Sequence, residues 1–465
     1  MTKTRTILIP AVVVVLSLGV WLFGVGVLRA DFSSVRDPGV RGGDPGAGGP
    51  IGSPIAPLTA DEREMFDVGL EDFSEAEGVT DGLGPRMNLD GCAGCHVTPA
   101  TGGSSPAVNP QVAFATKGGG TNQFPSAVIF SGGYTSPKGP IREVRFQFNP
   151  DGTRDGGVHN TATITGRTGA DGCSLALDDI RGEFANHNVI FRIPTPVFGA
   201  GLIEQINDGT ILGNLNANSF TKNSVGISGR PNRNGNDGTI TRFGWKAQNK
   251  SLLLFSGEAY NVEMGITNEL FQQEREEKAT CNFVTVPNDV TPSVRQISAI
   301  ENFANFQRFL APPTPVTTSF TTTTGKFVSA QSIADGKNVF MNIGCAFCHT
   351  PTLKTGSTTV AALRNQTVNL FSDVALHQMG PGLADDILQG AARGDEFRTS
   401  PLWGLGQRFF FLHDGRTPDL KVAIQAHKSA GNSKFGPSEA NKVIDNFNNL
   451  RDDDQQDLLN FLRSL

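Results

Sequence analysis

The feature that most constrains this chain is a short pattern, Cys-x-x-Cys-His, that occurs twice. This is the attachment pattern of haem c: two thiols bond to the vinyl groups of one porphyrin, and the adjacent histidine becomes the proximal ligand of its iron. The sequence therefore predicts two covalently bound haem c groups. The residues predicted to hold them are Cys92, Cys95 and His96 for one, and Cys345, Cys348 and His349 for the other.

Two other kinds of site use the same residue types. A four-cysteine zinc site would combine both cysteine pairs, and a thioredoxin-like dithiol would use one of them. However, a histidine follows the second cysteine in both copies, the copies lie far apart, and no βαβ pattern surrounds either. Haem attachment is the interpretation that accounts for both histidines.

The N-terminus indicates the compartment. Residues 7–28 form an uncharged apolar run, long enough to cross a bilayer as a helix, directly after Lys3 and Arg5. Residues 1–30 are therefore predicted to be an N-terminal membrane anchor, with a cleaved signal as the alternative, and the body is predicted to be exported to the periplasm. The net charge is −6 and no Lys/Arg cluster is present, which argues against nucleic-acid binding.

Hydrophobic periodicity and Gly/Pro content divide the rest of the chain. Residues 31–57 are predicted to be a Gly/Pro linker, 58–312 an N-terminal haem domain, 313–325 a second linker, and 326–465 a C-terminal cytochrome c domain. Helices are expected near residue 61, over 293–310, from residue 330 and over 452–465, whereas residues 100–290 are interpreted as inserted strands and loops. The fold class is mainly α with irregular and β insertions, in two cytochrome c-like domains of which the first is enlarged.

The remaining histidines and cysteines leave questions open. An iron with two protein ligands passes electrons, whereas an iron with one can bind peroxide or dioxygen. Periodicity and spacing do not choose a sixth ligand among His159, His187, His377, His413 and His427. Cys173 and Cys281 could form a disulfide in an oxidising compartment, and their pairing also stays open.

Several longer segments resemble one family in the expected order, from about residue 60 to the C-terminus. They are residues 82–88 (GLGPRMN), 192–199 (RIPTPVFG), 242–247 (RFGWKA), 264–267 (MGIT), 377–383 (HQMGPGL), 401–406 (PLWGLG) and 412–416 (LHDGR). These segments resemble the di-haem oxidoreductase family, also labelled thiol oxidoreductase, which is related to bacterial di-haem cytochrome c peroxidases.

The resemblance implies roles for particular residues. His427 matches the position of the distal ligand of the C-terminal haem, so the expected metal ligands are His96, His349 and His427. His413 is expected to hold a turn and a haem propionate, and His377 to be structural. Electrons are expected to pass from the C-terminal haem to an active-site haem in the N-terminal domain, in a peroxidase-like reaction with a periplasmic electron donor and a small oxidant, peroxide or dioxygen.

The chain departs from the peroxidase pattern at one position. The peroxidases have a glutamate eight residues after the tryptophan segment, and counting from Trp245 places Leu253 there. Glu258 and Glu263 lie close in sequence and are candidates to replace that glutamate, but a surface position is the simpler interpretation of each. No catalytic residue is assigned, and an apolar distal pocket would suit dioxygen or a lipophilic substrate better than peroxide. Trp245 and Trp403 are candidates for an aromatic step between the haems, with core packing as the simpler role of each.

Two alternative functions remain. One is a membrane-anchored electron-transfer cytochrome c with both irons saturated and no substrate chemistry. The other is an oxygenase that uses dioxygen on a lipophilic substrate, which an apolar distal pocket would suit. A calcium ion between the domains is conceivable, but no sequence feature supports it, and the substrate cannot be read from these residues.

Overall fold

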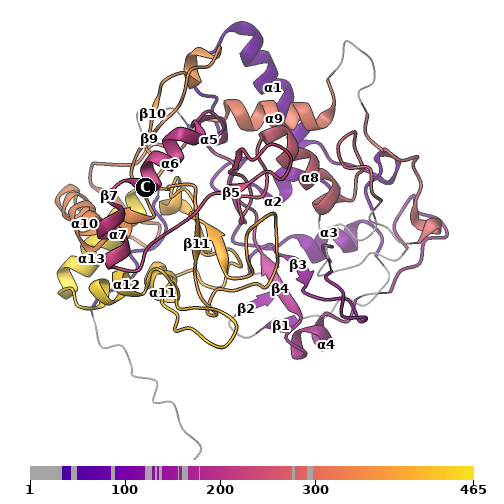
Figure 1. The fold of residues 1–465 in the computed structure, drawn as a ribbon. Helices are drawn as coiled ribbons and strands as arrows, with labels where there is room; N and C mark the ends of the chain where they lie inside the picture. Colours follow the sequence, from indigo (N-terminus) through magenta and orange to yellow (C-terminus); the bar gives the residue numbers. More distant parts are fainter. Residues whose placement is uncertain are drawn as a thin grey trace, which may run out of the picture. The chain divides into compact units, whose positions relative to one another are not determined.

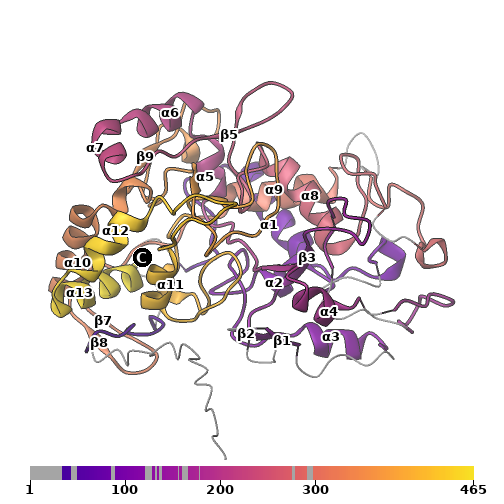
Figure 2. The same cartoon turned by 60° about the horizontal axis from the view of Figure 1, so that its bottom comes forward.

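The structure is a computed structural model of the chain, and it combines helices with short strands (Figures 1 and 2). The predicted anchor lies outside the residues that it describes. The contacts group residues 35–465 into one compact unit, and only Ser34 is described of the other unit, Met1–Ser34. The described residues are 34–42, 50–84, 89–120, 128–130, 133–135, 139–155, 157–159, 166–176, 178–274, 278–290 and 297–465.

Thirteen α-helices lie in these described ranges, together with short antiparallel strand pairs. The helices are α1 (Ala60–Ser74), α2 (Cys92–Cys95), α3 (Gln111–Lys117), α4 (Ile180–Ala185), α5 (Ala200–Glu204), α6 (Asp208–Asn216), α7 (Ser219–Ser224), α8 (Leu252–Met264), α9 (Ala299–Phe309), α10 (Ala330–Ile343), α11 (Leu420–Ala426), α12 (Asn441–Asn448) and α13 (Asp452–Ser464). The strand pairs are β1 (Val128–Phe130) with β2 (Gly133–Thr135), β3 (Glu143–Phe146) with β4 (Val189–Arg192), β5 (Asn232–Arg233) with β6 (Ile240–Thr241), β7 (Phe320–Thr321) with β8 (Phe327–Val328), β9 (Leu353–Lys354) with β10 (Thr367–Val368), and β11 (Leu376–Gln378) with β12 (Glu396–Arg398).

Each Cys-x-x-Cys-His segment follows a helix that packs against a later helix. α1 precedes the first segment and packs against α9, and α10 precedes the second and packs against α13. In Figures 1 and 2, α1, α8 and α9 lie together, as do α10, α11, α12 and α13. α10 ends at Gly344, whose left-handed conformation (φ 106°) turns the chain directly into Cys345.

A glycine allows close approach at each of these two helix crossings. A Cβ atom at Gly336 of α10 would lie 1.9 Å from the carbonyl oxygen of Asp457 in α13. A Cβ atom at Gly69 of α1 would lie 2.4 Å from the carbonyl oxygen of Asn302 in α9. Because both distances are too short for non-bonded atoms, a larger residue at either position would force the two helices apart.

Replacing Gly336 with alanine is expected to destabilise the fold by about 1–3 kcal/mol, because overpacking displaces a helix backbone that cannot yield locally. The midpoint of chemical denaturation, at unchanged slope, measures this loss. Gly213→Ala in α6 is the matched control, since an added Cβ there meets nothing within 4 Å, and it is expected to leave stability unchanged or slightly higher. If both variants had the same denaturation midpoint as the natural protein, the close crossing of α10 and α13 would be refuted.

Both Cys-x-x-Cys-His segments rest on aromatic-rich cores. The core beside the first segment includes Phe66, Phe73, Tyr260, Met264, Phe303 and Phe306, with Cys92 packed against it. The core beside the second includes Phe340, Phe371, Phe447, Leu459 and Phe461, with Cys345 and Cys348 packed against it. These cores bury the apolar faces of the flanking helices and hold the two segments in place.

Several predictions about local structure are confirmed. Helices form at the four predicted places, as α1, α9, α10 and α13, and the strand expected near residue 141 is β3. The described fold is mainly helical with irregular parts, as predicted. The division into two cytochrome c-like domains, with boundaries at 313–325, stays a prediction.

Two regions differ from expectation. The 100–290 region contains six helices within its described residues, α3 to α8, as well as strands. Residues 34–42, expected to be an unfolded linker, are instead held by the C-terminal region: Val35 enters its core, and Asp37 pairs with Arg463 at 2.7 Å. A buried apolar residue, a buried ion pair and main-chain hydrogen bonds, such as that from Arg41 N–H to the Gly406 oxygen, together hold a segment whose average composition is that of a linker.

Cys173 and Cys281 form a disulfide, which answers the pairing question that the sequence left open. Both cysteines are buried against Ala170 and Leu175. The bond closes a long loop, with a sequence separation of 108 residues, and so restricts the inserted region.

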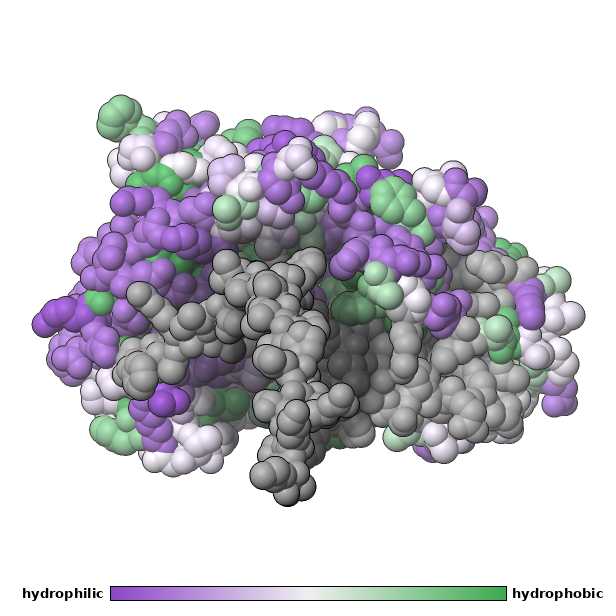
Figure 3. Space-filling model, turned by 90° about the horizontal axis from the view of Figure 1, so that it is seen from below, coloured by the Kyte–Doolittle hydropathy of each residue, from purple (hydrophilic) through white to green (hydrophobic). Residues whose placement is uncertain are grey.

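The surface gives no sign of a broad apolar contact area on the face drawn in Figure 3. There, hydrophobic residues are scattered among hydrophilic ones wherever the structure describes the residues. Within the same described ranges, no helix is both long enough and apolar enough to span a membrane.

Candidate functional site

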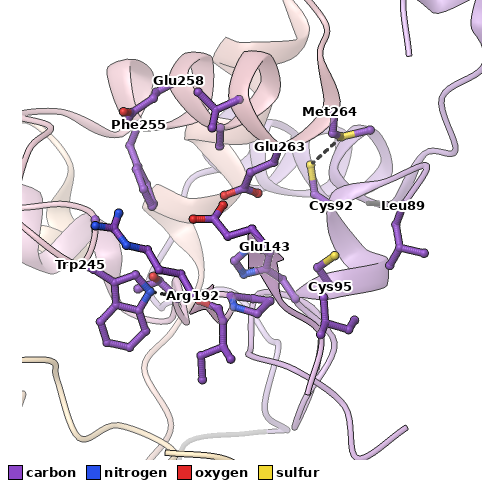
Figure 4. Close-up of a pocket in the computed structure, with 18 of the residues that line it drawn as sticks. Leu89, Cys92, Cys95, Glu143, Arg192, Trp245, Phe255, Glu258, Glu263 and Met264 are labelled. Carbon is purple, nitrogen blue, oxygen red and sulfur yellow. Dashed lines mark hydrogen bonds between the residues drawn. The ribbon is translucent and has the colours of Figure 1, made fainter. Parts of the chain in front are cut away.

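The first Cys-x-x-Cys-His segment lines a cavity of about 890 Å³, hereafter the N-terminal cavity. Its other walls come from β3, from the residues that follow β4, from Trp245 and from α8. In Figure 4 the sulfur atoms of Cys92 and Cys95 lie on one side and Trp245 on the other. The carboxylates of Glu143 and Glu263 point toward each other between them (Figure 4).

One face of α8 forms a wall of this cavity. The residues that line it are spaced as one helical stripe: Phe255, Glu258, Ala259, Val262 and Glu263. The interpretation of Glu258 and Glu263 as surface residues was therefore wrong, because the stripe turns both carboxyl groups inward. Leu253 instead packs against the hydrophobic cores beside α8. Because Glu258 and Glu263 line the cavity, it is not the apolar pocket that was expected.

The carboxyl groups in the N-terminal cavity differ in their surroundings. Glu143 pairs with Arg145 at 2.7 Å, and Glu258 accepts hydrogen bonds from the amides of Gln248 and Asn249. Burial, together with the nearby charges of Glu143 and Glu258, raises the pKa of Glu263 to about 8, although Arg145 opposes the shift. Glu263 is thus mainly protonated at neutral pH and is suited to donate a proton.

The second Cys-x-x-Cys-His segment lines a larger cavity of about 1590 Å³, hereafter the C-terminal cavity. His349 and His427 both line it, and His427 lies at the C-terminal end of α11. Most of the other lining side chains are apolar, and they come from α10, α11, α12 and α13 and from segments outside these helices, mainly within 193–196 and 397–412. The cavity therefore combines two imidazoles with an apolar enclosure.

The three histidines predicted as iron ligands share one hydrogen-bond arrangement. In His96, His349 and His427, Nδ1 lies 3.1, 3.0 and 2.8 Å, respectively, from a main-chain carbonyl oxygen. A carbonyl oxygen only accepts, so Nδ1 carries the proton and Nε2 keeps its lone pair. Burial lowers the pKa of all three rings, to about 4 in His96 and His349. Neutral rings oriented in this way are typical of metal ligands.

Two other histidines have a different arrangement. Both ring nitrogens of His377 face carboxylates, Asp373 at 2.9 Å and Glu439 at 2.7 Å. His159 lies in the same way between two aspartates, at 2.9 and 3.0 Å. Because each nitrogen faces an acceptor, these rings carry both protons and have no lone pair for a metal. The structural role expected for His377 agrees with this geometry.

His413 also lines the C-terminal cavity, as its predicted role beside a propionate requires. Its ring stacks on Phe397 with 4.3 Å between the centroids. Its main-chain oxygen accepts the N–H of Ile193 at 2.8 Å, which holds the turn against the residues between the two cavities.

The two cavities share a wall. Ile193, Pro194 and Trp245 line both of them, and Trp245 Nε1 donates to the carbonyl oxygen of Ile193 at 3.1 Å. Trp245 therefore lies in the wall between the two cavities, and core packing, the simpler role expected for it, does not account for this position. Core packing does describe Trp403, which is 4 % exposed within a hydrophobic core.

Two arginines, the buried Arg398 and the half-buried Arg408, also face the C-terminal cavity. Their hydrogen bonds go to main-chain carbonyl oxygens. No described carboxylate pairs with either one. Burial lowers the pKa of each to about 10, which leaves both cationic. Two cations at a cavity wall, one buried and one half-buried, that lack a described carboxylate partner indicate a site for a negatively charged group.

Comparison with known proteins identifies the family. A family model described as "Di-haem oxidoreductase, putative peroxidase" matches residues 175–465. The chain belongs to the di-haem oxidoreductase family. No curated protein matches the sequence. The family match confirms the resemblance seen in the sequence motifs. In this di-haem oxidoreductase, the matched range includes Trp245, α8 and the second Cys-x-x-Cys-His segment, whereas the first segment lies outside that range.

Membership of this family implies haem, and the residues of both cavities fit that group. Each cavity has two thiols and a neutral histidine that presents Nε2. Arg398 and Arg408 fit the propionates, since they are cations that lack a carboxylate partner among the described residues. Within the described ranges, no group of three or more His, Cys, Asp or Glu side chains is arranged to bind a metal ion.

Sequence reasoning did not assign several residues that line these cavities. Glu143 and Arg145 alternate with Val144 on β3, a two-residue period that places both charges on one face. For the cavity-lining stripe of α8, the sequence did contain a signal, namely the helical spacing of residues that begins at Phe255. For Arg398 and Arg408 no local signal exists, because an arginine shows its missing partner only after folding.

Proposed function

We propose that this di-haem oxidoreductase is an exported enzyme that holds two haem c groups covalently and reduces a peroxide in the N-terminal cavity. The proposed attachment residues are Cys92, Cys95 and His96, together with Cys345, Cys348 and His349. The observation that carries the peroxidase assignment is the acidic wall of the N-terminal cavity, where Glu263 has a raised pKa next to the Glu143–Arg145 pair.

Bound haem supplies an iron that accepts oxygen ligands and exchanges electrons. The protein residues supply the proton. Glu263 holds a proton on its carboxyl group at neutral pH and donates it to the departing oxygen of a peroxide in this cavity. Arg145 adds positive charge beside Glu143, which favours negative charge on a substrate oxygen.

The C-terminal cavity is proposed to receive electrons. His349 and His427 both line it with Nε2 available, and two protein ligands suit electron transfer rather than substrate binding. Trp245, in the shared wall, is the proposed aromatic step toward the N-terminal cavity. Haem held in the two cavities would allow electrons from a periplasmic donor to enter at the C-terminal cavity and reach the N-terminal cavity. Residues 7–28 are the proposed membrane anchor.

The alternatives receive less support from the cavities. The oxygenase reading relied on an apolar distal pocket, and the N-terminal cavity instead contains three glutamates. The electron carrier requires a second protein ligand for the N-terminal haem. His96 is the one histidine among the described residues that line the N-terminal cavity, so no second histidine there supplies that ligand. The sulfur atom of Met264, which also lines the cavity, lies beside the sulfur atom of Cys92.

Carbon monoxide binding and EPR spectroscopy on the purified protein test this assignment. We expect one high-spin haem that binds carbon monoxide and one low-spin haem that does not. His427→Ala is expected to convert the low-spin haem to high spin, because it removes the sixth ligand. The control His187→Ala changes an exposed residue outside both cavities and is expected to leave both signals unchanged. Two low-spin haems inert to carbon monoxide would favour the electron carrier, and an unaltered low-spin signal in His427→Ala would exclude His427 as a ligand.

A further inference from the structure

A buried tyrosine of α8, Tyr260, lies next to the N-terminal cavity without lining it. Tyr260 is 4 % exposed, and its hydroxyl donates a hydrogen bond to Glu77 Oε1 at 2.8 Å. Glu77 is only half-buried. The chain contains two tyrosines in all, and the other is Tyr134 in β2. In a hydrogen-bonded pair of this kind, the phenol can lose an electron while its proton passes to the carboxylate.

Sulfur atoms connect this tyrosine with the first Cys-x-x-Cys-His segment. The Sγ atom of Cys92 lies 4.0 Å from the Sδ atom of Met264. Met264 follows Tyr260 by one turn of α8, so both side chains share one helix face. Tyr260 and Met264 belong to the same hydrophobic core, against which Cys92 packs.

Aromatic rings provide a second connection, which begins at His96. The ring centroids are 6.0 Å apart between His96 and Phe73, 6.2 Å between Phe73 and Phe303, and 5.0 Å between Phe303 and Tyr260. These rings meet edge to face within one packed core. Tyr260 is therefore joined to both the predicted attachment cysteine and the predicted iron ligand of the N-terminal haem.

The electrostatic surroundings of the pair favour coupled loss of an electron and a proton. Burial, with Glu77 and other carboxylates nearby, raises the pKa of Tyr260, so the phenol does not ionise by itself. Burial also raises the pKa of Glu77 to about 7, although its hydrogen bond from Tyr260 opposes the shift. A carboxyl group with that pKa can both accept a proton and return it near neutral pH.

We infer that Tyr260 is a one-electron donor to the N-terminal haem centre and that Glu77 is its proton acceptor. The inference rests on the proposed function, since peroxide supplies the oxidising equivalents. In the step, the O–H bond of Tyr260 breaks. The electron passes to the peroxide-oxidised haem centre, which is reduced by one electron, and the proton passes to the Glu77 carboxylate. The products are a neutral tyrosyl radical and a carboxylic acid.

The reverse step restores the pair. One electron from the periplasmic donor reduces the tyrosyl radical, and the proton returns from Glu77 to the phenol oxygen. Tyr260 thus stores one oxidising equivalent away from the cavity whenever the C-terminal haem has no electron to deliver.

Rapid freeze-quench EPR on the haem-loaded, full-length protein tests the inference. Samples are mixed with hydrogen peroxide without an electron donor, and the haem absorption spectrum is recorded in parallel. We expect a tyrosyl radical in the natural protein and in the control Tyr134→Phe, and loss of that radical in Tyr260→Phe. Haem oxidation with an unchanged radical in Tyr260→Phe, or with no radical in any of the proteins, would overturn the inference.

A second measurement separates this inference from the proposed function. Flash-quench photo-oxidation with a ruthenium polypyridyl complex oxidises the haem without peroxide, so the electron transfer from Tyr260 is tested even if the protein does not react with peroxide. Glu77→Gln keeps the tyrosine and an acceptor oxygen but removes the proton acceptor. We expect this variant to lose the rapid tyrosyl signal and its solvent isotope effect, while its circular dichroism matches that of the natural protein. Equal radical yields in Glu77→Gln and the natural protein would refute the role of Glu77.

Discussion

A variant in which Cys345 and Cys348 are both serine is expected to be purified with one covalently bound haem instead of two. Serine cannot form the thioether bonds proposed to hold a porphyrin at the C-terminal cavity, whereas Cys92 and Cys95 are untouched. The pyridine haemochrome spectrum gives the number of haems per chain. The remaining haem is expected to be the one that binds carbon monoxide, because the low-spin centre at His349 and His427 has been removed.

The complementary variant, with Cys92 and Cys95 replaced, serves as the control. It is expected to keep the low-spin haem and to lose carbon monoxide binding. If either double variant fails to accumulate, the single variant Cys345→Ser keeps one thioether bond, and its unsaturated vinyl group shifts the haemochrome band to longer wavelength. Two intact haem signals in the first variant, or zinc in place of haem in the natural protein, would refute covalent attachment at these positions.

Local sequence signals were enough to predict the parts of the site that lie close together in the chain. The first Cys-x-x-Cys-His segment and the helix before it lie within residues 60–96, and the second segment and its helix lie within residues 330–349. α1, for example, begins with a capping box in which Thr59 and Glu62 exchange hydrogen bonds. His427 was found differently, through its spacing from His413 in a family resemblance, and the structure brings it into the same cavity as His349.

The chemistry of the N-terminal cavity could not be predicted in this way because it depends on long-range packing. Glu143 comes from β3 and Glu263 from α8, and the two meet only after folding. Counting eight residues from Trp245, to the position of the peroxidase glutamate, led to Leu253. However, α8 begins after Ser251, and its orientation turns Leu253 into the core. The raised pKa of Glu263 likewise arises first from burial and then from the charge of Glu143, a residue distant in sequence.

Replacing Glu263 with glutamine is expected to lower the rate of reaction with peroxide by about 10²–10⁴-fold, the usual contribution of a positioned proton donor. Glutamine keeps the size of the side chain and its ability to donate a hydrogen bond, but it has no proton to transfer. In the natural protein the donor is active below the raised pKa of about 8. The rate is therefore expected to fall as the pH rises through that value, and the fall is expected to disappear in the variant.

Glu258→Gln provides a matched control, because Glu258 lines the same cavity but already accepts hydrogen bonds from Gln248 and Asn249. Removing its charge would lower the pKa of Glu263 slightly, since the two carboxylates repel each other. The control should therefore keep most of the activity, with the falling limb of its pH profile moved to lower pH. A Glu263→Gln variant that retained both the natural rate and the natural pH profile would assign the proton donor to another group. A Glu258→Gln variant that lost the same activity would make the pair, rather than Glu263 alone, responsible for proton transfer.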